Sequence, residues 1–454
     1  MPECIPETPV GHTTGKINPA KTCQPMGAMY AALGIHACLP HSHGSQGCCA
    51  YHRMHLTRHF RDPVLASSSS FTEGASVFGG AANLKTSIKN VFAIYNPEVM
   101  AVHTTCLSET IGDDIPNILK TAEIPEGKTV IHVNTPSYQG SHITGFAGMC
   151  KAMVAYLSRS DGFQKDQVNV LPGFVNPGDM REIRRIVNEL GVHLIMFPDT
   201  SGVLDAPLTG KYEMYPQGGA TVAEIRDAGN SSLTLALGAF ASNDAADLLQ
   251  EKCGVTGIPL KLPIGLKATD EFVMAIKDWF GVDVPASLAT ERGQVVDTLI
   301  DTNIHYQGKT VAIFGDPDHV IAMTEFALTL GMVPKYILTG TPGKTFEPEI
   351  RKMLDEAGIN GARVKAEGDL FELHQWIKEE KVDLLIGTTY GKYIARAEDI
   401  PLVRFGFPVL DRAVHPLMPV VGYLGCLRLI EQISNALLDR RDRDSLDEDY
   451  ELVL

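Results

Sequence analysis

The stretch that decides the fold reads Val168-Asn-Val-Leu171-Pro-Gly-Phe-Val-Asn-Pro-Gly-Asp-Met180-Arg-Glu-Ile-Arg-Arg-Ile-Val-Asn-Glu-Leu190-Gly-Val-His-Leu194-Ile-Met-Phe197. Its two ends, 168–171 and 194–197, are short apolar runs that predict buried strands. Between them lies one apolar helix face with the spacing 0, 3, 4 and 7, made of Ile183, Ile186, Val187 and Leu190. A strand, a helix and a strand in this order predict two parallel strands joined by a crossover helix.

The same alternation continues on both sides of this stretch. Further strands are predicted at 99–102, 129–133, 232–237, 258–262, 309–315, 336–339 and 382–386, and further helices at 244–252, 285–306, 320–330 and 347–357. The repeated pattern predicts an α/β protein made of doubly wound, Rossmann-like parallel sheets. We place domain limits near residues 160 and 295, which gives domains at 1–160, 161–295 and 296–454.

Both ends of the chain differ from this alternating middle. The first 20 residues contain four prolines and no periodicity, which predicts a loosely structured arm. At the other end, 439–451 is a run of charges, typical of a solvated helix end.

Length and composition narrow the function classes. A chain of 454 residues is too long for a single hydrophobic core, so we expect two or three domains. Its 44% hydrophobic residues are enough to form their cores. The net charge of −15 argues against nucleic acid or an anionic membrane as the main partner. No apolar run approaches the roughly 20 residues of a membrane span. The first residues lack the basic region and apolar core of a signal peptide, so we expect a cytoplasmic protein.

The nine cysteines do not form a disulfide scaffold, because the chain is long and the number is odd. Two of them end the stretch His41-Ser-His-Gly-Ser-Gln-Gly-Cys-Cys49, which its Gly and Ser content predicts to be a loop. Two more, Cys23 and Cys106, have similarly polar neighbours. A metal cluster, a nucleophile and ordinary buried thiols are the three possible explanations.

Spacing separates these explanations in part. A zinc site favours close pairs such as Cys-x-x-Cys, and this region has none. A Cys48–His43 nucleophile lacks any recognisable hydrolase pattern. Cys23, Cys48 and Cys106, which lie 25 and 58 positions apart, match the separate loops of an iron–sulfur site. Ordinary clusters take four ligands, so a non-thiol ligand or a second chain must complete such a site, and buried free thiols stay an alternative.

Two other motifs favour structural interpretations. Residues 339–345 resemble a phosphate-binding loop, but Leu338 stands where that motif needs glycine, so we expect an ordinary turn. Asp316 and Asp318 follow a predicted strand and are expected to cap the next helix, with a cation at a subunit contact as the weaker alternative.

The pair Asp113-Asp114 is also interpreted as a helix cap, placed before the predicted helix 115–119. The alternative is a pair of carboxylates that binds a hard cation.

Several long motifs, in order, carry a resemblance to a known family. They are Lys16–Pro25, His43–Cys48, Phe71–Gly80, Thr104–Cys106 with Ile111–Asp114, Asn134–His142, Pro285–Leu288 with Glu291–Gly293, and Arg404–Pro408 with Asp411-Arg412. Over nearly its whole length the sequence resembles the nitrogenase component 1 family, in particular the beta chains of molybdenum–iron proteins. It is most similar to the short form, which lacks an N-terminal extension.

The resemblance implies three α/β domains and an α2β2 tetramer with the nitrogenase alpha chain. It further implies an [8Fe-7S] P-cluster shared between the two chains, to which this chain contributes Cys23, Cys48 and Cys106. Ser137 matches a serine that ligates the oxidised cluster, although a turn hydroxyl after Pro136 is the structural alternative. Cys49 is then expected to pack, and the two histidines of 41–49 to be structural.

The resemblance also implies a route for electrons. Phe78 matches an aromatic residue near the surface where the iron protein docks, whereas burial beside Gly79-Gly80 is the alternative. Electrons pass through the P-cluster to the iron–molybdenum cofactor of the alpha chain, where dinitrogen is reduced to ammonia. Because this cofactor belongs to the alpha chain, no catalytic residue is expected in this chain. ATP is hydrolysed on the iron protein, which agrees with the absence of a phosphate-binding loop.

Three rival interpretations accompany this one. A cofactor-assembly scaffold is disfavoured because all three cysteines and Ser137 are present. The beta chain of a vanadium or iron-only nitrogenase is disfavoured because such chains tend to carry glycine where Ser45 stands. An unrelated α/β enzyme with incidental thiols is the third.

Overall fold

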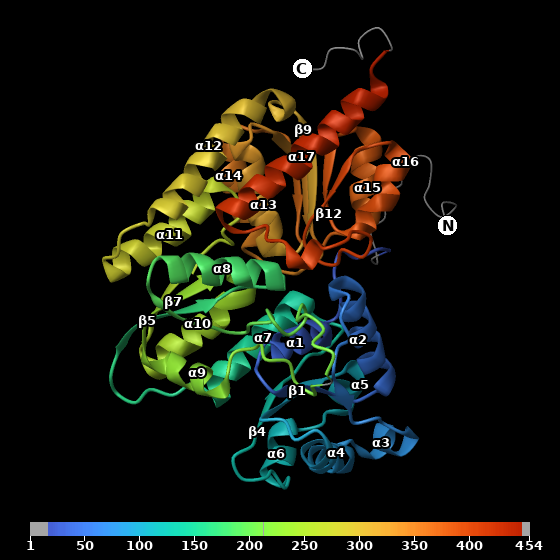
Figure 1. Ribbon diagram of the computed structural model, residues 1–454. Helices are drawn as coiled ribbons and strands as arrows, with labels where there is room; N and C mark the ends of the chain where they lie inside the picture. The colour runs from blue at the N-terminus through green and yellow to red at the C-terminus, as the bar shows by residue number, and fades with distance from the viewer. Residues whose placement is uncertain (1–16, 212, 447–454) are drawn as a thin grey trace.

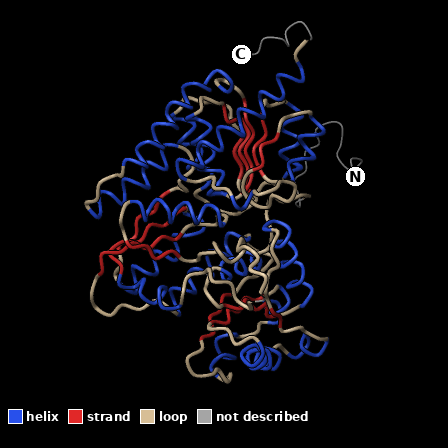
Figure 2. The backbone as a smooth tube through the Cα atoms, viewed as in Figure 1, coloured by secondary structure: helices blue, strands red, loops and turns tan. Residues whose placement is uncertain are grey.

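The computed structural model describes residues 17–211 and 213–446, and three sheets of parallel strands organise this part of the chain. Figure 1 shows three groups of elements, with the first in blue and cyan, the second in green and the third in orange and red. Figure 2 shows the three sheets as separate sets of strands, each flanked by helices. The prediction of an α/β fold built from parallel sheets is confirmed.

The first sheet has the order β2-β1-β3-β4. Its strands are β1 (Cys38–His43), β2 (Ser67–Ser68), β3 (Val99–Thr104) and β4 (Thr129–Val133). Its helices are α1 (Gln24–Leu33), α2 (Gln46–Phe60), α3 (Glu73–Phe78), α4 (Ala81–Ile94), α5 (Cys106–Ile111), α6 (Ile115–Lys120) and α7 (His142–Tyr156).

The second sheet has the order β6-β5-β7-β8. Its strands are β5 (Lys165–Leu171), β6 (His193–Met196), β7 (Ser231–Leu237) and β8 (Thr256–Leu260). The helices of this part are α8 (Pro177–Glu189), α9 (Val222–Asp227), η1 (Ala228–Asn230), α10 (Ala239–Cys253), α11 (Leu266–Phe280) and α12 (Ala286–Tyr306).

The third sheet has the order β11-β10-β9-β12-β13. Its strands are β9 (Thr310–Gly315), β10 (Val333–Thr339), β11 (Arg363–Lys365), β12 (Leu384–Gly387) and β13 (Leu402–Arg404). Its helices are α13 (Pro317–Thr329), α14 (Phe346–Glu356), α15 (Leu370–Glu379), η2 (Thr389–Gly391), α16 (Lys392–Glu398), η3 (His415–Leu417) and α17 (Gly422–Asp444).

Every strand and helix predicted from the alternating pattern is present, with small shifts at the ends. The helix that carries the predicted apolar face from Ile183 to Leu190 begins at Pro177, because the residues there provide the signals of a helix start. Asp179 accepts a hydrogen bond from the backbone N–H of Asn176, and proline occupies the first turn.

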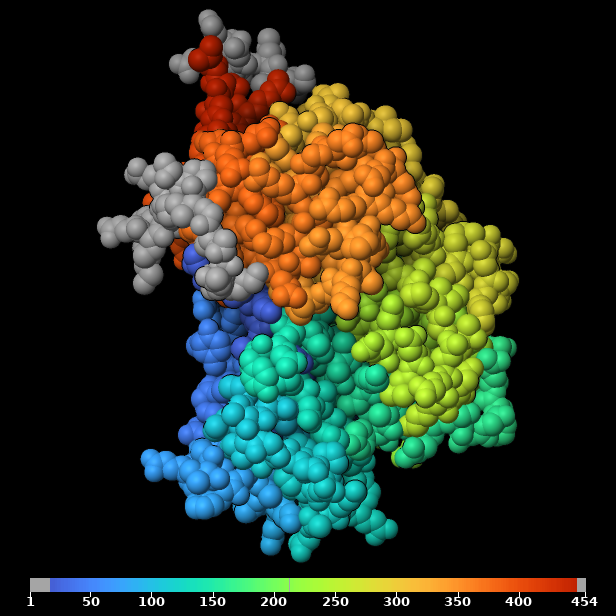
Figure 3. Space-filling model, turned by 180° about the vertical axis from the view of Figure 1, so that it is seen from behind, coloured from blue at the N-terminus to red at the C-terminus, as the bar shows by residue number. Residues whose placement is uncertain are grey.

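The domain limits near 160 and 295 stay a prediction. The first falls between α7 and β5, whereas the second falls inside α12. One hydrophobic cluster joins the second and third sheets, and another joins the first and second. Figure 3 shows the three parts in contact along their shared boundaries.

One expectation about 41–49 is wrong. The stretch is not a loop, since its first three residues end strand β1 and its last four begin helix α2. Only Gly44-Ser45 connects the two elements. Gly and Ser serve here as the turn between a buried strand and a helix, and the sequence pattern did not separate this short turn from a longer loop.

The N-terminal end of the described chain differs from expectation, whereas the C-terminal end agrees with it. Residues 17–20 lie against the third part, because the N–H of Ile17 donates to Asp369 Oδ2 and the N–H of Leu370 donates to the carbonyl of Asn18. The rest of the expected arm lies outside the described residues. The expected charged helix end is present as the last turns of α17, up to Asp444.

Helices α1 and α7 pack with their backbones in contact at the centre of the molecule (Figure 1). A Cβ atom on Gly27 of α1 would lie 1.7 Å from the carbonyl oxygen of His142, and one on Gly145 of α7 would lie 1.9 Å from that of Gln24. Because Cys23 directly precedes α1, this contact fixes the place of its thiol relative to the first sheet.

No helix in the described residues is long and apolar enough to cross a membrane.

Gly27→Ala should lower the thermal midpoint, and it should lower the free energy of unfolding by about 1–3 kcal/mol or more. The added methyl group would overlap the backbone of His142, which cannot move aside as a side chain can. Gly293→Ala is the matched control, since Gly293 is exposed within α12 with open space around it. That change should raise stability by roughly 0.5–1 kcal/mol. Denaturant unfolding of both variants measures the difference, and equal stability would contradict the proposed packing.

Candidate metal centre

The strand order of the first sheet creates a crevice at its centre. From β1 the sheet continues to β2 on one side, and from β3 it continues to β4 on the other. Ligands bind at such a topological switch point, outside the carboxyl ends of the strands. Cys48 follows β1 and Cys106 follows β3, so two of the three predicted cysteines lie at this position.

Each of the three cysteines stands at the start of a helix. Cys23 is the N-cap of α1, Cys48 is the third residue of α2, and Cys106 is the first residue of α5. The first turn of a helix has backbone N–H groups without partners inside the helix, and neither Cys23 nor Ser45 caps these groups with its side chain. Free N–H groups beside thiolates are suited to hydrogen-bond sulfur and to favour negative charge.

The three thiols lie close enough together to influence one another electrostatically. Burial raises the pKa of the Cys23 thiol, and Cys106 raises it further, whereas Lys21 lowers it. Burial also raises the pKa of Cys48, with further increases from Cys106 and Cys23. The thiolate forms are therefore disfavoured in this chain alone, and a bound metal group would favour them.

The turn that contains Ser137 is bound to Gln24, the residue that follows Cys23. The side-chain amide of Gln24 donates to the carbonyls of Pro136 and Gln139, at 3.1 Å each. Those two carbonyls flank Ser137 in a turn where Ser137 itself is half-buried. The turn is thus tied to the start of α1, and both interpretations of Ser137 remain compatible with it.

A second set of contacts joins the Ser137 turn to the strand before Cys106. The backbone N–H of Thr135 donates to Thr104 Oγ1 at 2.7 Å, and the hydroxyl of Thr135 donates to the carbonyl of Thr104 at 2.6 Å. Thr104 also bonds to Glu109 of α5. Through Thr104, these hydrogen bonds connect the end of β4 to helix α5.

The turn after β1 and the turn after β3 are in close contact, with no room for a side chain at Gly44. A Cβ atom on Gly44 would lie 1.9 Å from Thr105 Oγ1, and Gly44 has a φ of 138°, which only glycine adopts readily. The N–H of Thr105 and the hydroxyl of Ser108 both donate to the carbonyl of His43. The chain therefore fixes the relative placement of the Cys48 and Cys106 helices.

The neighbouring thiol and histidines have structural roles. Cys49 is buried, and its thiol faces the carbonyl of Ser67. His41 bonds to the hydroxyls of Ser67 and Ser69, and His43 bonds to Ser69 and Asp113. Burial lowers the pKa of His41 to about 3 and also lowers that of His43, so these rings serve as neutral hydrogen-bonding groups.

The donor set fits a cluster of several irons better than a single ion. Within the described residues, no three His, Cys, Asp or Glu side chains surround one metal position. The three soft thiolates with one nearby hydroxyl are donors typical of separate irons in an iron–sulfur cluster. Cys23 is exposed, and Cys48 and Cys106 are half-buried, so the thiols open toward a face of the chain.

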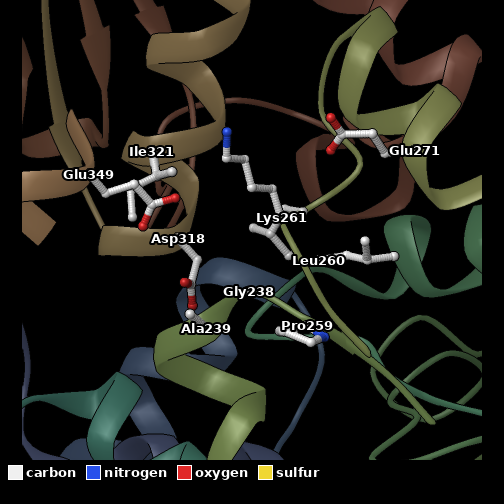
Figure 4. A pocket seen from close by; sticks show the side chains of 10 residues that line it. Gly238, Ala239, Pro259, Leu260, Lys261, Glu271, Asp318, Ile321 and Glu349 are labelled. Carbon is white, nitrogen blue, oxygen red and sulfur yellow. The ribbon is translucent and has the colours of Figure 1, made fainter. Parts of the chain in front are cut away.

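The two aspartates after β9 do not cap helix α13 with their side chains, contrary to the prediction. Asp318 instead accepts the N–H groups of Phe240 and Ala241, at the start of α10 in the second part. Figure 4 shows the carboxylate of Asp318 pointing toward Ala239, in a cavity that Lys261 also lines.

The carboxylate of Asp316 faces His142, with 2.7 Å between Oδ1 and Nε2. Both aspartates are buried within the chain. A sequence motif could not reveal that each carboxylate serves a different part of the molecule.

Two other predictions are confirmed. Asp114 caps α6, because its carboxylate accepts the N–H of Asn117. Residues 340–345 form an ordinary connection between β10 and α14, and a Cβ on Gly340 would lie 2.6 Å from the backbone of Ala20, which leaves no room for phosphate there.

Comparison with known proteins identifies the family. The protein-family model described as "Nitrogenase component 1 type Oxidoreductase" matches residues 23–438. The chain belongs to this family. It is 58% identical, over the full length of both chains, to the nitrogenase molybdenum-iron protein beta chain of Clostridium pasteurianum. It is 41% identical to that of Frankia alni, covering 96% of this chain and 85% of the relative.

Solved structures agree with this assignment to the family. A chain of nitrogenase Cp1 at pH 6.5 has a TM-score of 0.98 at 57% identity, with 100% of both chains covered. A chain of nitrogenase Cp1 at pH 5 has a TM-score of 0.73 at 19% identity, covering 96% and 92%, which shows a shared fold. The family resemblance and its fold are therefore confirmed.

Proposed function

We propose that the chain holds half of an [8Fe-7S] P-cluster through Cys23, Cys48 and Cys106, as the beta subunit of a molybdenum–iron nitrogenase. In this role it relays electrons from the iron protein toward the iron–molybdenum cofactor of the alpha chain, where dinitrogen is reduced to ammonia. The gathering of three accessible thiols at a switch point carries the proposal. Similarity to named molybdenum–iron beta chains supports it.

The residues of this chain have separate tasks at such a site. When bound, an iron–sulfur cluster supplies one-electron oxidation and reduction. The thiolates of the three cysteines hold it, and the helix N–H groups hydrogen-bond its sulfur. The Ser137 hydroxyl becomes a hard alkoxide donor when it loses its proton, so its ligation favours oxidised iron and couples electron loss to proton loss.

The alpha chain is proposed to complete the site from the open side. Large apolar side chains stand exposed around the thiols, among them Tyr51 at 61% and Tyr138 at 63%. Tyr51 follows Cys48 by one turn of α2, and Tyr138 follows Ser137. Exposed aromatic groups around an incomplete ligand set are typical of a surface that another chain covers. We propose an α2β2 tetramer located in the cytoplasm, which membership of the family supports.

The iron protein is proposed to dock near Phe78. This side chain is 90% exposed at the end of α3, beside Val77, which is also exposed. The alternative of a buried Phe78 is wrong. Exposed aromatic side chains are costly in water and are common anchors of protein interfaces.

Neither rival within the family gains support from a specific feature of this chain. A scaffold has no need of the complete set formed by three cysteines and Ser137, and Ser45 argues against the vanadium and iron-only forms. We propose no acid, base or nucleophile in this chain, because the reduction takes place in the alpha chain.

Cys106→Ala should deplete cluster iron while leaving the fold largely intact, because it removes a ligand from the surface of the crevice. Cys49→Ala is the matched control, since its buried thiol only packs against Ser67. Iron analysis and redox spectroscopy of the anaerobically purified tetramer measure both. If Cys106→Ala keeps full iron content and activity, the ligand assignment is wrong.

Ser137→Ala should change the spectrum of the oxidised cluster more than that of the reduced cluster, because only the oxidised irons favour the alkoxide. Spectra recorded at poised potentials test this. Equal effects in both states, or none in either, would leave Ser137 as a turn residue.

Phe78→Ala should raise the concentration of iron protein needed for half-maximal activity by roughly 10-fold or more, as expected for a buried aromatic anchor. Phe163→Ala is the control, since Phe163 is also well exposed, at 68%, but lies in the loop before β5. Titration of nitrogenase activity with iron protein compares them, and identical curves would place docking elsewhere.

A further inference from the structure

The exposed end of α3 is connected to the cysteine crevice through one carboxylate, that of Asp113. The chain leaves α3 at Phe78 and turns through Gly79 and Gly80 into α4. The backbone N–H of Gly80 donates to both oxygens of Asp113, at 2.9 and 3.1 Å. A carboxylate that accepts a backbone N–H holds that backbone in place more firmly than a neutral acceptor does.

The glycines before α4 are required by this contact. A Cβ atom on Gly80 would lie 2.0 Å from the ring of Phe71 and 2.7 Å from Asp113 Oδ2. Gly79 has a φ of 96°, a conformation that side chains rarely allow. The turn next to Phe78 is thus pressed against Asp113, with no layer of side chains between them.

Asp113 leads from this turn to both cysteine helices. It follows α5, which begins at Cys106, and its own N–H donates to the carbonyl of Ser108 in that helix. Its Oδ2 lies 3.1 Å from Nε2 of His43, the last residue of the strand that leads to Cys48. Asp113 therefore contacts the segments that lead to two of the three thiols, that of Cys48 through its side chain and that of Cys106 through its backbone.

His43 connects Asp113 to a chain of hydrogen bonds. Nε2 of His43 bonds to Oδ2 of Asp113, and its Nδ1 bonds to the Ser69 hydroxyl. Ser69 also bonds to Nε2 of His41, whose Nδ1 bonds to the Ser67 hydroxyl. Apart from the edge at β2, these groups are buried, so Asp113 terminates an ordered network beneath the crevice.

We propose that Asp113 is a positioning residue that couples docking at the α3 surface to the placement of Cys48 and Cys106. A partner that presses on Phe78 displaces the Gly79-Gly80 turn. Asp113 passes that displacement to His43 and to α5, and so to the thiols. The inference rests on the proposed function, because it needs both a docked iron protein and a cluster at these cysteines.

Asp113→Ala tests the coupling, with Asp114→Ala as the matched control. Asp114 is the exposed neighbour that caps α6 and bonds to Asn117 alone among the described side chains. In the anaerobically purified tetramer, Asp113→Ala should lower the rate of electron transfer at saturating iron protein by about 3- to 30-fold, the range that mutations along coupled networks produce. The half-saturating concentration of iron protein and the iron content should stay within twofold of wild type, and Asp114→Ala should match wild type throughout.

Asp113→Asn keeps the size of the side chain and one acceptor oxygen for Gly80, so it should recover part of the lost rate. If Asp113→Ala disturbs folding, this variant carries the test. A wild-type saturating rate in Asp113→Ala would overturn the inference, as would loss of cluster iron in both variants. Failure of the proposed function is distinguished by the wild-type tetramer, which would then hold no cluster or accept no electrons from the iron protein.

Discussion

The parallel pairing of β1 with β3 is the interaction on which the site depends. Six residue pairs, from Cys38 with Val99 to His43 with Thr104, hold the two strands in register. Because the sheet continues in opposite directions from these strands, their carboxyl ends form a topological switch point, the usual ligand position in such sheets. Gly44 allows the turns after β1 and β3 to touch, and each turn leads into a helix whose first turn contains a cysteine. A slip of one residue in this register would turn the buried side chains of β1 to the opposite face and separate the thiols.

The third cysteine reaches the crevice by a different route. Residues 17–22 run from the third part of the molecule to the first, and backbone contact between α1 and α7 fixes where that segment ends. Gln24 and His142 then bind this segment to the Ser137 turn and to Asp316. The thiol of Cys23 therefore depends on contacts in the first and third parts of the fold, whereas Cys48 and Cys106 depend on one sheet. Burial and the neighbouring thiols raise the pKa of Cys23 and Cys48, and the proposed metal group would favour their thiolate forms.

The sequence predicted the parallel sheets because the period of their apolar residues is a local property, as in the helix around Ile183 and the strand at 168–171. It also indicated the three cysteines, through spacing and resemblance. It did not reveal that 41–49 is a strand and a helix start, since burial of His41 and His43 depends on hydroxyls more than twenty residues away. The roles of Asp113, Gln24 and Asp318 were equally hidden. The side chain of each of these residues forms hydrogen bonds with backbone groups that are distant in sequence. Rules based on local propensity assign such residues to the nearest helix cap. Exposure of Phe78 likewise follows from tertiary packing, which glycine neighbours alone do not determine.

X-ray diffraction at the iron absorption edge tests the central claim most directly, using crystals of the anaerobically purified complex with its alpha chain. Our account predicts a compact group of iron peaks in contact with the sulfur atoms of Cys23, Cys48 and Cys106, at the face where the two chains meet. Iron peaks absent from this crevice, or a group of irons bound to other thiols such as Cys253, would contradict it.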